Sequence, residues 1–535
     1  MNVLPQLRYA GRVFIRAGPL ALFLAFGIVP LAWMVLQAIG AAANSDALTD
    51  PSLWPLLGRT VALSLSVALG ATLLGTIGGY LLGATPWPGK MPCRAILVLP
   101  LAIPPYLHAI GWTTLLRPRG VVASSASSFF GISPSLISES LYSFGGAAAV
   151  LILAYFPITL LFTERSLALS SPVLGEAARV EGANPWQTFA VHRWPFLKPA
   201  VASSAMIVFL LASSDLGVPT ILTVPVFNFE VFTQLGAFND VTAATLLTVP
   251  LLIVGFLALT VERRLTLGNL HEIDAGDIAS PRAATSRETR FNWLFFFVLV
   301  LIVLGLPIGA IVSQAFDSEA LRQMSELAKG PTLNTFQYAG SAAILITGIA
   351  FALAWLLRNA SPSVLRRIDW LLIVGFAVPS TILALSLLAL YDRPTLSQWI
   401  TPAVLVVAAL VIRYTIIGYR IAAATIGQFP SALFEAAALD GAGPIRIAWH
   451  ILLPMIHVAV LATLTIAFVF SVGEIGSTIL LHPPGGETLP IALYSIEANS
   501  PRSYVAALTL IQLLVSLSPL LLVALALKAT RQGMR

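Results

Sequence analysis

The sequence predicts an all-α integral membrane protein of about 12 transmembrane helices in two parallel six-helix repeats. Three observations lead to this fold class. The chain of 535 residues is 57% hydrophobic and only 10% charged, whereas soluble domains carry roughly 25% charged residues. Its apolar residues form blocks of about 20 residues, which is the length of a helix that crosses a bilayer. Finally, motifs of the first half recur in the second half.

The apolar blocks predict six spans on each side of a polar segment. Those of the first half are 18–40, 59–83, 93–115, 144–166, 198–222 and 241–263, and those of the second half are 291–314, 338–357, 369–390, 400–422, 457–480 and 505–528. The first block follows three arginines, as a signal peptide would. Because it is longer than the apolar region of a signal peptide, about 7–15 residues, we expect it to be a retained helix.

Basic residues are distributed unevenly between the two sides of these spans. If the N-terminus is cytoplasmic, 22 Lys and Arg residues fall on the cytoplasmic side and 7 on the other. This asymmetry follows the positive-inside rule and predicts a multi-pass inner-membrane protein with both termini in the cytoplasm. It also accounts for the net charge of +6 without nucleic acid. Cys93 is the single cysteine, which excludes an intrachain disulfide and a cysteine-based zinc cluster.

Several residues recur 259 positions later in the chain. The matched pairs are Tyr155 with Tyr414, Glu176 with Glu435, Gly182 with Gly441, Pro195 with Pro454 and Asp215 with Glu474. Because six spans is an even number, both copies have the same orientation and form parallel repeats. We therefore expect a first repeat at 1–263, a polar cytoplasmic linker at 264–290 and a second repeat at 291–535.

The recurring segments 176–195 and 435–454 lie between the fourth and fifth spans of their halves, on the cytoplasmic side. Each begins with Glu-Ala-Ala, which favours helix, and continues to a glycine that ends the helix. Asn184-Pro185 and Gly443-Pro444 then open a second helix. A helix–break–helix elbow is predicted in both copies. Packing within the chain would explain one such loop, but explains two matched copies poorly.

The spacing of Glu-Ala-Ala, Gly and Pro resembles the EAA motif of ABC importer permeases. The second copy keeps the fuller ending of that motif in Ile451-Leu452-Leu453-Pro454, whereas His192-Arg193-Trp194-Pro195 keeps only the proline. In that family the motif forms coupling helices that dock in a groove of the ATPase subunit. The resemblance implies this contact for Glu176, Ala177, Ala178, Gly182, Pro195, Glu435, Ala436, Ala437, Gly441 and Pro454.

The resemblance covers nearly the whole chain and is closest to fused two-domain permeases of the ferric-iron type, whose relatives import thiamine, polyamines or phosphonates. It implies two copies of an ABC ATPase and a periplasmic solute-binding protein as partners, with lipid around the spans and no nucleic acid. The cargo would be ferric iron above the alternatives, moved by ATP-driven alternating access. ATP and magnesium would be used by the partner ATPase, and this chain would bind no cofactor and no resident metal.

Asp215 and Glu474 are acids inside predicted spans, each 17 positions past the start of its span. That places them about 25 Å from the cytoplasmic end. Acids within the membrane are costly and are candidates for function, so both are predicted to line the substrate pathway. The alternative is that they cap helices that restart after a break. Carboxylate oxygens suit a hard cation such as ferric iron, but they suit an organic cation equally.

Three other residues in the spans bear on this pathway. Arg413 has no basic partner in the first half, and we expect it to pair with Glu474 or to extend toward the membrane surface. Pro104 and Pro379 occupy corresponding positions in the two halves and predict helix kinks. Prolines of this kind bend many helices that line no pathway, so they support a pathway only in combination with the acids.

The sequence contains no G-x-x-x-x-G-K-[ST] phosphate-binding loop, so we expect no ATP hydrolysis by this chain and no enzyme activity. An ion-coupled secondary transporter shares the 12 spans and the two halves. It has no ATPase to dock, however, and the duplicated elbow therefore favours an ABC permease. An intramembrane enzyme is the least favoured class, because the spans carry no cluster of catalytic residues.

Overall fold

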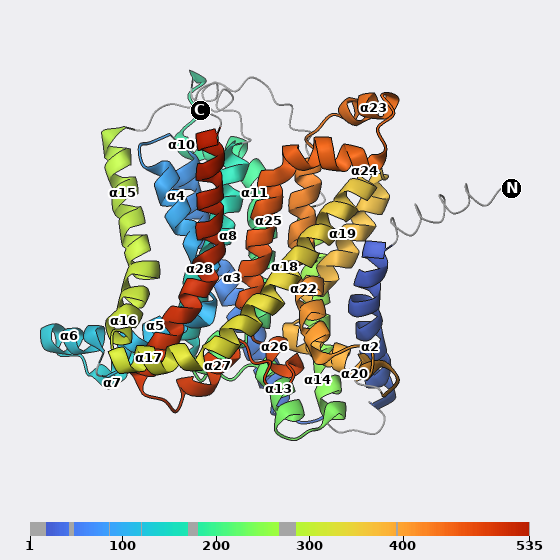
Figure 1. The fold of residues 1–535 in the computed structure, drawn as a ribbon. Helices are drawn as coiled ribbons and strands as arrows, with labels where there is room; N and C mark the ends of the chain where they lie inside the picture. The colour runs from blue at the N-terminus through green and yellow to red at the C-terminus, as the bar shows by residue number, and fades with distance from the viewer. Residues whose placement is uncertain are drawn as a thin grey trace.

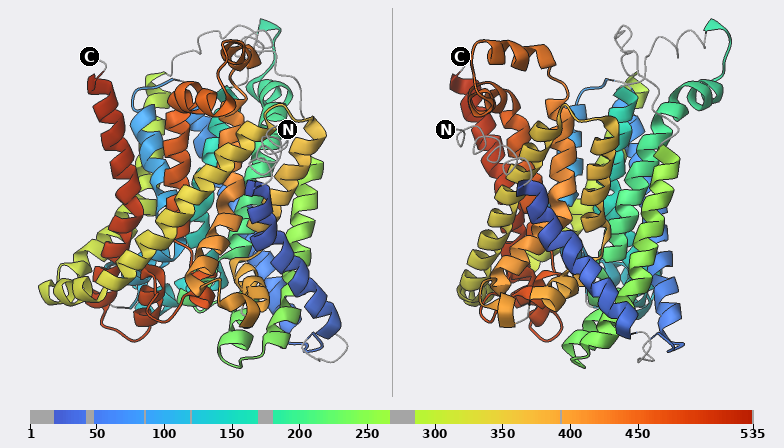
Figure 2. Two further views of the ribbon diagram at one scale, coloured as in Figure 1. Left: turned by 45° about the vertical axis from the view of Figure 1, so that its right-hand side comes forward. Right: turned by 90° about the vertical axis from the view of Figure 1, so that its right-hand side faces the viewer.

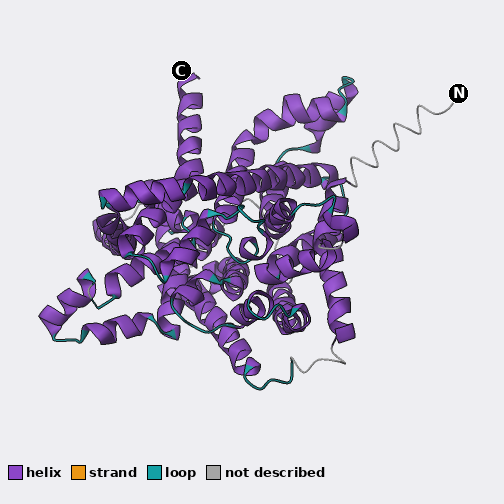
Figure 3. Ribbon diagram, turned by 60° about the horizontal axis from the view of Figure 1, so that its bottom comes forward, coloured by secondary structure: helices purple, strands orange, loops and turns teal. Residues whose placement is uncertain are grey.

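The computed structural model describes residues 18–41, 48–84, 86–118, 120–168, 180–266, 285–391 and 394–533. Within these ranges the chain is helical and contains no strand (Figure 3). Ten helices are long and apolar enough to cross a membrane, and the number rises to 12 if each of two bent pairs is one span. The predicted class of all-α, multi-span membrane protein is confirmed.

The first half contains twelve α-helices, two π-helices and one 3₁₀-helix within the described ranges. They are η1 (Leu24–Ile28), α2 (Val29–Ala41), α3 (Leu53–Gly83), α4 (Lys90–Val98), η2 (Leu99–Ala102), α5 (Pro105–Leu116), α6 (Val121–Phe130), α7 (Pro134–Leu141), α8 (Phe144–Ala168), α10 (Pro185–Thr188), η3 (Phe189–Arg193), α11 (Trp194–Ser214), α12 (Gly217–Ile221), α13 (Phe227–Gly236) and α14 (Val241–Thr266), of which α6, α7, α10, α12 and α13 are short.

The second half repeats the succession of long helices. Its elements are α15 (Ser286–Val300), η4 (Leu301–Gly305), α16 (Leu306–Ala315), α17 (Ser318–Leu327), α18 (Lys329–Leu357), α19 (Pro362–Ala377), α20 (Ser380–Tyr391), α21 (Pro394–Ser397), α22 (Pro402–Ile426), α23 (Ser431–Leu439), α24 (Pro444–Ile447), η5 (Ala448–Leu452), α25 (Leu453–Val472), α26 (Thr478–Leu481), α27 (Leu489–Glu497) and α28 (Arg502–Gly533).

The third span of each half is sharply bent, and the bend interrupts the continuous span that the sequence predicted. The axes turn by 95° between α4 and α5, and by 98° between α19 and α20. Each bend lies where a proline follows an extended residue, Ile103 before Pro104 and Val378 before Pro379. A proline ring clashes with a helical conformation of the residue before it. The kinks expected at Pro104 and Pro379 are therefore present, and they are complete breaks.

The predicted spans 198–222 and 457–480 extend beyond the ends of the observed helices. The helix α11 ends at Ser214 and α25 ends at Val472, and short helices follow after each break. Asp215 leaves the helix in an extended conformation, and its carboxylate accepts the backbone N–H of Val218. A short polar side chain that hydrogen-bonds to the nearby backbone competes with continuation of a helix. Hydropathy does not depend on such hydrogen bonds, so it predicted spans that were too long.

Small residues hold α3 and α8 close together. A Cβ atom added to Gly75 would lie 2.5 Å from the carbonyl oxygen of Phe156, and one added to Gly79 would lie 2.5 Å from that of Leu160. Membrane helices associate through close backbone approach at small residues spaced in this way. This packing fixes α8, which carries Tyr155 into the centre of the molecule.

The first helix of each half packs against the other half. Phe26 stacks on Tyr391 of α20 with ring centroids 5.2 Å apart, and the Tyr391 hydroxyl donates to the Ala25 carbonyl. In return, Phe296 of α15 stacks on Trp87 at 5.8 Å, and α16 packs against α5. The two sequence repeats thus exchange their first helices in space.

The two ends of the helix bundle differ in character. The short helices α6, α7, α13, α17, α26 and α27 gather at one end, whereas α10, α23 and α24 extend from the opposite end, near the C-terminus (Figures 1 and 2). This second end is the one that the charge asymmetry assigns to the cytoplasm. The repeated elbows of both halves therefore lie at the same end of the molecule.

Candidate functional site

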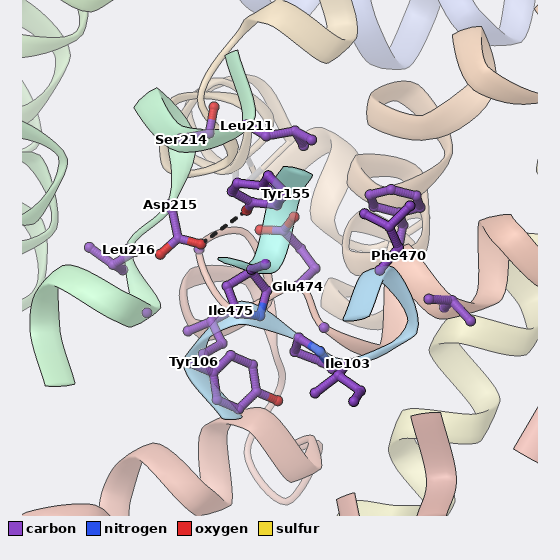
Figure 4. Close-up of a pocket in the computed structure, with 18 of the residues that line it drawn as sticks. Ile103, Tyr106, Tyr155, Leu211, Ser214, Asp215, Leu216, Phe470, Glu474 and Ile475 are labelled. Carbon is purple, nitrogen blue, oxygen red and sulfur yellow. Dashed lines mark hydrogen bonds between the residues drawn. The ribbon is translucent and has the colours of Figure 1, made fainter. Parts of the chain in front are cut away.

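A small cavity lies between the two halves, where the broken helices meet (Figure 4). Its volume is about 80 Å³. The break before α5, the breaks after α11 and α25, and the centres of α8 and α22 surround it. The polar residues among its lining are Tyr106, Tyr155, Ser214, Asp215, Arg413, Tyr414 and Glu474.

Asp215 enters this cavity from the break after α11. The Tyr155 hydroxyl donates to its Oδ2 at 3.3 Å, and the Val218 N–H donates to its Oδ1 at 2.9 Å. Figure 4 shows the carboxylate pointing toward the Tyr155 hydroxyl. The same side chain therefore caps the restarted chain and also lines the cavity. The cap expected as one alternative is present, and the role in a substrate pathway stays a prediction.

Glu474 occupies the corresponding break after α25 and is more firmly held. The Tyr414 hydroxyl donates to its Oε2 at 2.6 Å, and the guanidinium Nε of Arg413 lies 3.2 Å from the same oxygen. The Ser477 N–H donates to Oε1 at 3.4 Å. Arg413 thus forms the predicted ion pair, and its NH1 also donates to the carbonyl of Val378 at the bend of the third helix.

The two acids have matching tyrosines but unequal charge compensation. Each acid accepts a hydroxyl from the tyrosine 60 positions before it. Arg413 neutralises Glu474 in place, and it is the one basic residue among the described residues that line the cavity. Asp215 has hydrogen-bond donors, and no cation of the described residues forms an ion pair with it. The cavity therefore combines two carboxyl groups with one guanidinium, which is an environment that attracts a cation.

A second, larger cavity of about 530 Å³ adjoins the small one. Both are lined by Leu101, Leu211, Val469 and Phe470. The larger cavity is almost wholly apolar, and residues of both halves line it. Arg420, which lines this larger cavity, donates two hydrogen bonds to the carboxylate of Asp369, with N–O distances of 3.0 and 2.9 Å. The two cavities lie next to each other between the halves, and apolar side chains line the region that they share.

The repeated elbows form the second candidate site. Gly182 and Gly441 adopt left-handed backbone conformations with φ of 90° and 83°, which glycine reaches without steric cost. Glu435 and Ala436 are exposed on α23, and Ala437 is half-buried. Pro195 and Pro454 are exposed second residues of α11 and α25. Glu176, Ala177 and Ala178 lie outside the described residues.

Each elbow exposes one large apolar side chain on either side of its glycine. Val180 and Leu439, which correspond in the repeat, are both 89% exposed, and the matched pair Trp186 and Ile445 are 72% and 69% exposed. Solvated apolar side chains gathered at one end of a protein indicate a contact surface for another protein or for a membrane. The sequence motif drew attention to the glutamates and glycines, and these apolar residues were missed.

The helices that follow the elbows begin in the same unusual way. Asn184 and Gln187 cap each other's backbone N–H groups at 2.7 and 2.9 Å, which confirms that Asn184-Pro185 opens a helix. A five-residue π-helix follows in each copy, at Phe189–Arg193 and at Ala448–Leu452. A proline stands two positions beyond each π-helix, and its missing N–H accounts for the local change in hydrogen bonding.

The sequence predicts Arg413 as one possible partner of Glu474, but it does not predict the tyrosines that donate to the two acids. Tyr155 and Tyr414 are a repeated pair to which the sequence alone assigns no role. Their signal was present, because a tyrosine conserved between two internal repeats in the middle of a span needs a polar partner there. Tyr106 and Phe470 reach the cavity only because helices break or converge nearby, and no pattern in the sequence marks them.

Comparison with known proteins adds independent observations. Residues 344–532 match the family described as "Binding-protein-dependent transport system inner membrane component". The ferric transport system permease protein FbpB of Actinobacillus pleuropneumoniae is 26% identical over 405 residues, which cover 72% of this chain and 58% of that protein. The Fe(3+)-transport system permease protein FbpB 2 of Haemophilus influenzae is 24% identical over 490 residues, which cover 90% of this chain and 91% of that protein.

A more distant relative is half as long. The putative 2-aminoethylphosphonate transport system permease protein PhnV of Salmonella typhi is 26% identical over 260 residues, which cover 44% of this chain and 94% of that protein. The putative ferric transport system permease protein FbpB 1 of Haemophilus influenzae is 27% identical over 407 residues. For this protein and for FbpB of Actinobacillus pleuropneumoniae, the matched region spans less than two thirds of their own length, at 63% and 58%.

Proposed function

We propose, from the binding-protein-dependent transport permease domain that residues 344–532 carry, that the whole chain is the membrane permease of an ABC importer for ferric iron. A periplasmic binding protein delivers the cargo to the outer face. Two copies of a separate ATPase bind the cytoplasmic elbows and supply the energy, using ATP and magnesium. This chain holds no cofactor, and both of its termini lie in the cytoplasm.

The observation that carries the proposal is the pair of matched elbows at one end of the molecule. Each has a left-handed glycine between two exposed apolar side chains, and both lie on the side favoured by the basic residues. A secondary transporter has no partner to seat on two such elbows. Docking of one ATPase on each elbow would bury Val180 and Trp186 in one half, and Leu439 and Ile445 in the other.

The connection between elbow and pathway supports a mechanical role. The helix that leaves each elbow, α11 or α25, ends at the break that presents Asp215 or Glu474 to the cavity. Movement of an elbow would therefore be transmitted through a single helix to the acid that lines the cavity. Closure of the ATPase pair on ATP would bring the elbows together and rock the two halves, which is alternating access by rigid-body motion.

Ferric iron is favoured by the chemistry of the cavity and by the names of the relatives. Carboxylate and phenol oxygens are hard donors that suit a highly charged cation, and two relatives of this chain are named ferric transport permeases. No group of three His, Cys, Asp or Glu that could hold a metal ion occurs among the described residues. Cargo would thus be held weakly in passage, and selection would rest mainly with the binding protein.

A phosphonate permease is the second candidate, because relatives named for 2-aminoethylphosphonate match this chain. The basic residue in the cavity, Arg413, is already paired with Glu474, which leaves little positive charge for a phosphonate. Thiamine and polyamines are organic cations that the acids would also accommodate. Uptake measured with ferric iron and with each of these solutes in parallel decides between them.

The docking proposal is tested with the full chain and its ATPase in proteoliposomes. Substituting Val180→Asp and Leu439→Asp together should abolish co-purification of the ATPase and cargo-stimulated ATP hydrolysis. The control is Phe129→Asp, which changes an 83% exposed side chain on α6, at the opposite end of the molecule (Figure 1). Glu176→Ala with Glu435→Ala tests the motif itself. Unchanged assembly and transport in these variants would favour the secondary-transporter alternative.

A further inference from the structure

A basic hollow lies at the membrane surface between the first-half helices, well away from the central cavity. Its volume is about 470 Å³, and it is formed by the loop before α4, the start of α4 and the end of α8. Lys90, Arg94 and Arg165 line it, together with a single acid, Glu164. The proposed transport mechanism uses none of these residues.

The charges in this hollow are only partly compensated. The Lys90 ammonium and an Arg94 guanidinium nitrogen lie 3.6 and 3.7 Å from the same oxygen of Glu164, whose side chain is 7% exposed. Both distances exceed ordinary hydrogen-bond length, so Glu164 does not occupy the N–H groups of either cation. With Arg165 counted, three cations face one carboxylate. Burial of Glu164 thus positions two basic side chains and leaves an excess of positive charge.

Trp87 adds a hydrogen-bond donor and an anchor at the membrane interface. It lines the hollow and is 6% exposed, yet its indole N–H has no hydrogen-bond partner within the part of the chain that the structure describes. Its ring is fixed between Phe296 and Trp293 of α15, at 5.8 and 5.5 Å. Trp293 is itself 45% exposed. Tryptophans at the ends of spans mark the level of lipid headgroups, and a buried donor without a partner is costly unless a ligand supplies one.

We propose that this hollow binds the phosphate of an anionic phospholipid headgroup. Phosphate oxygens would accept from Lys90, Arg94 and the indole of Trp87, while the acyl chains would lie along the exposed apolar residues of α15. A basic pocket between membrane helices on the side of the basic loops is the arrangement that recognises such headgroups. The inference goes beyond the transport function and holds whichever cargo is carried.

The second half carries basic residues on the corresponding helix that do not line this hollow, and these provide a control. The corresponding helix α19 carries Asp369, which is already paired with Arg420 of α22. Arg366 and Arg367 are exposed on α19 and do not line the hollow. Removal of their charges changes the net charge of the protein by the same amount as removal of Lys90 and Arg94.

The test is native mass spectrometry of the full chain in detergent, titrated separately with phosphatidylglycerol, phosphatidylcholine and inorganic phosphate. The wild type should retain one phosphatidylglycerol in preference to phosphatidylcholine. Lys90→Gln with Arg94→Gln should weaken this binding about tenfold or more, since each basic residue near a membrane surface contributes roughly one order of magnitude or less. Arg366→Gln with Arg367→Gln should leave it unchanged.

Trp87→Phe guards against a folding artefact, because phenylalanine keeps an aromatic ring against Phe296 and removes the N–H. We expect about threefold weaker binding, as for loss of one hydrogen bond, with an unchanged unfolding temperature. Phosphatidylglycerol affinity that is unaltered in both the double variant and Trp87→Phe would overturn the proposal. Equal loss in the α19 control would also overturn it, as would saturable binding of inorganic phosphate with no preference among the lipids.

Discussion

Two acids at equivalent positions of the repeat have different surroundings. Glu474 is paired with Arg413 and accepts a hydroxyl and a backbone N–H, so its charge is balanced within the protein. Asp215 accepts a hydroxyl and a backbone N–H, and no cation among the described residues forms an ion pair with it. A charge balanced by the fold contributes mainly to structure, whereas an unbalanced one remains open to a ligand. We therefore expect Glu474 to serve the fold and Asp215 to serve transport.

Glu474→Gln should destabilise the protein strongly. It leaves the guanidinium of Arg413, whose side chain is 4% exposed, without its counter-charge, and breaking a buried ion pair costs about 3–5 kcal/mol. Thermal unfolding in detergent measures the effect. Adding Arg413→Met should recover most of the loss, since replacing both charged partners by uncharged groups is often neutral. A single variant as stable as the wild type would contradict the structural role of this pair.

Asp215→Asn should spare the fold and impair transport. The amide still accepts the Val218 N–H, so we expect a change in unfolding free energy of about 1 kcal/mol or less. Loss of the carboxylate should lower ferric iron uptake about tenfold, which corresponds to one charge-assisted contact. Uptake into proteoliposomes with the binding protein and the ATPase present is the measurement. Tyr155→Phe is the matched control and should have the smaller effect, so equal uptake by all three proteins would remove Asp215 from the pathway.

At the scale of elements, the elbows depend on a backbone conformation as well as on side chains. Gly182 and Gly441 have positive φ, and a Cβ added to either would meet nothing within 4 Å. Glycine is therefore required for its backbone conformation, and not because a larger side chain would clash with neighbouring atoms. In the second elbow this one residue sets the angle between α23 and α24. The direction of the exposed apolar side chains on those helices is set with it.

Gly441→Val should weaken coupling to the ATPase without unfolding the permease. A β-branched residue resists the left-handed conformation, at a cost of about 1–2 kcal/mol, and the elbow would relax to another angle. Gly441→Asn is the control, because asparagine tolerates this conformation. ATP hydrolysis stimulated by cargo should fall severalfold in the valine variant and little in the asparagine variant. Equal activity in both would show that the angle of the elbow is not needed for docking.

At the scale of the whole molecule, the two repeats are interlocked. The first helix of each half contributes aromatic contacts to the other half, Phe26 to Tyr391 and Phe296 to Trp87. Each half by itself would expose the surface that normally receives its partner's helix. The two cavities lie between the halves, so the exchange of first helices also holds together the walls of these cavities.

Separate expression of the halves tests this interdependence. Cutting the chain after residue 275, in the predicted linker, and producing both pieces together should give a complex that co-purifies through a tag on either piece. Each piece produced alone should aggregate or be degraded, because its receiving surface is uncovered. Tyr391→Ala in the second piece should weaken assembly, since it removes the stack and the hydrogen bond to Ala25. Stable monodisperse halves would contradict the interlocked arrangement.

The sequence by itself determined the membrane class, the number and approximate positions of the spans, the repeat offset and the positions of the elbows. These properties follow from local composition, from charge counts and from recurrence within the chain, none of which needs a contact between distant residues. It also located Asp215 and Glu474, because an acid in an apolar block is conspicuous wherever the block folds. The prolines marked the bends, although not their angle.

Only the tertiary structure decided how these parts meet. The apolar blocks of the sequence extend across Pro104, Pro379, Asp215 and Gly473, so their hydropathy predicted continuous spans. Backbone sterics and local hydrogen bonds end the helices at these positions. The pairing of Arg413 with Glu474, the exchange of first helices and the basic hollow at Lys90 join residues far apart in the chain. Such contacts depend on the packing of whole helices, which the local sequence does not encode.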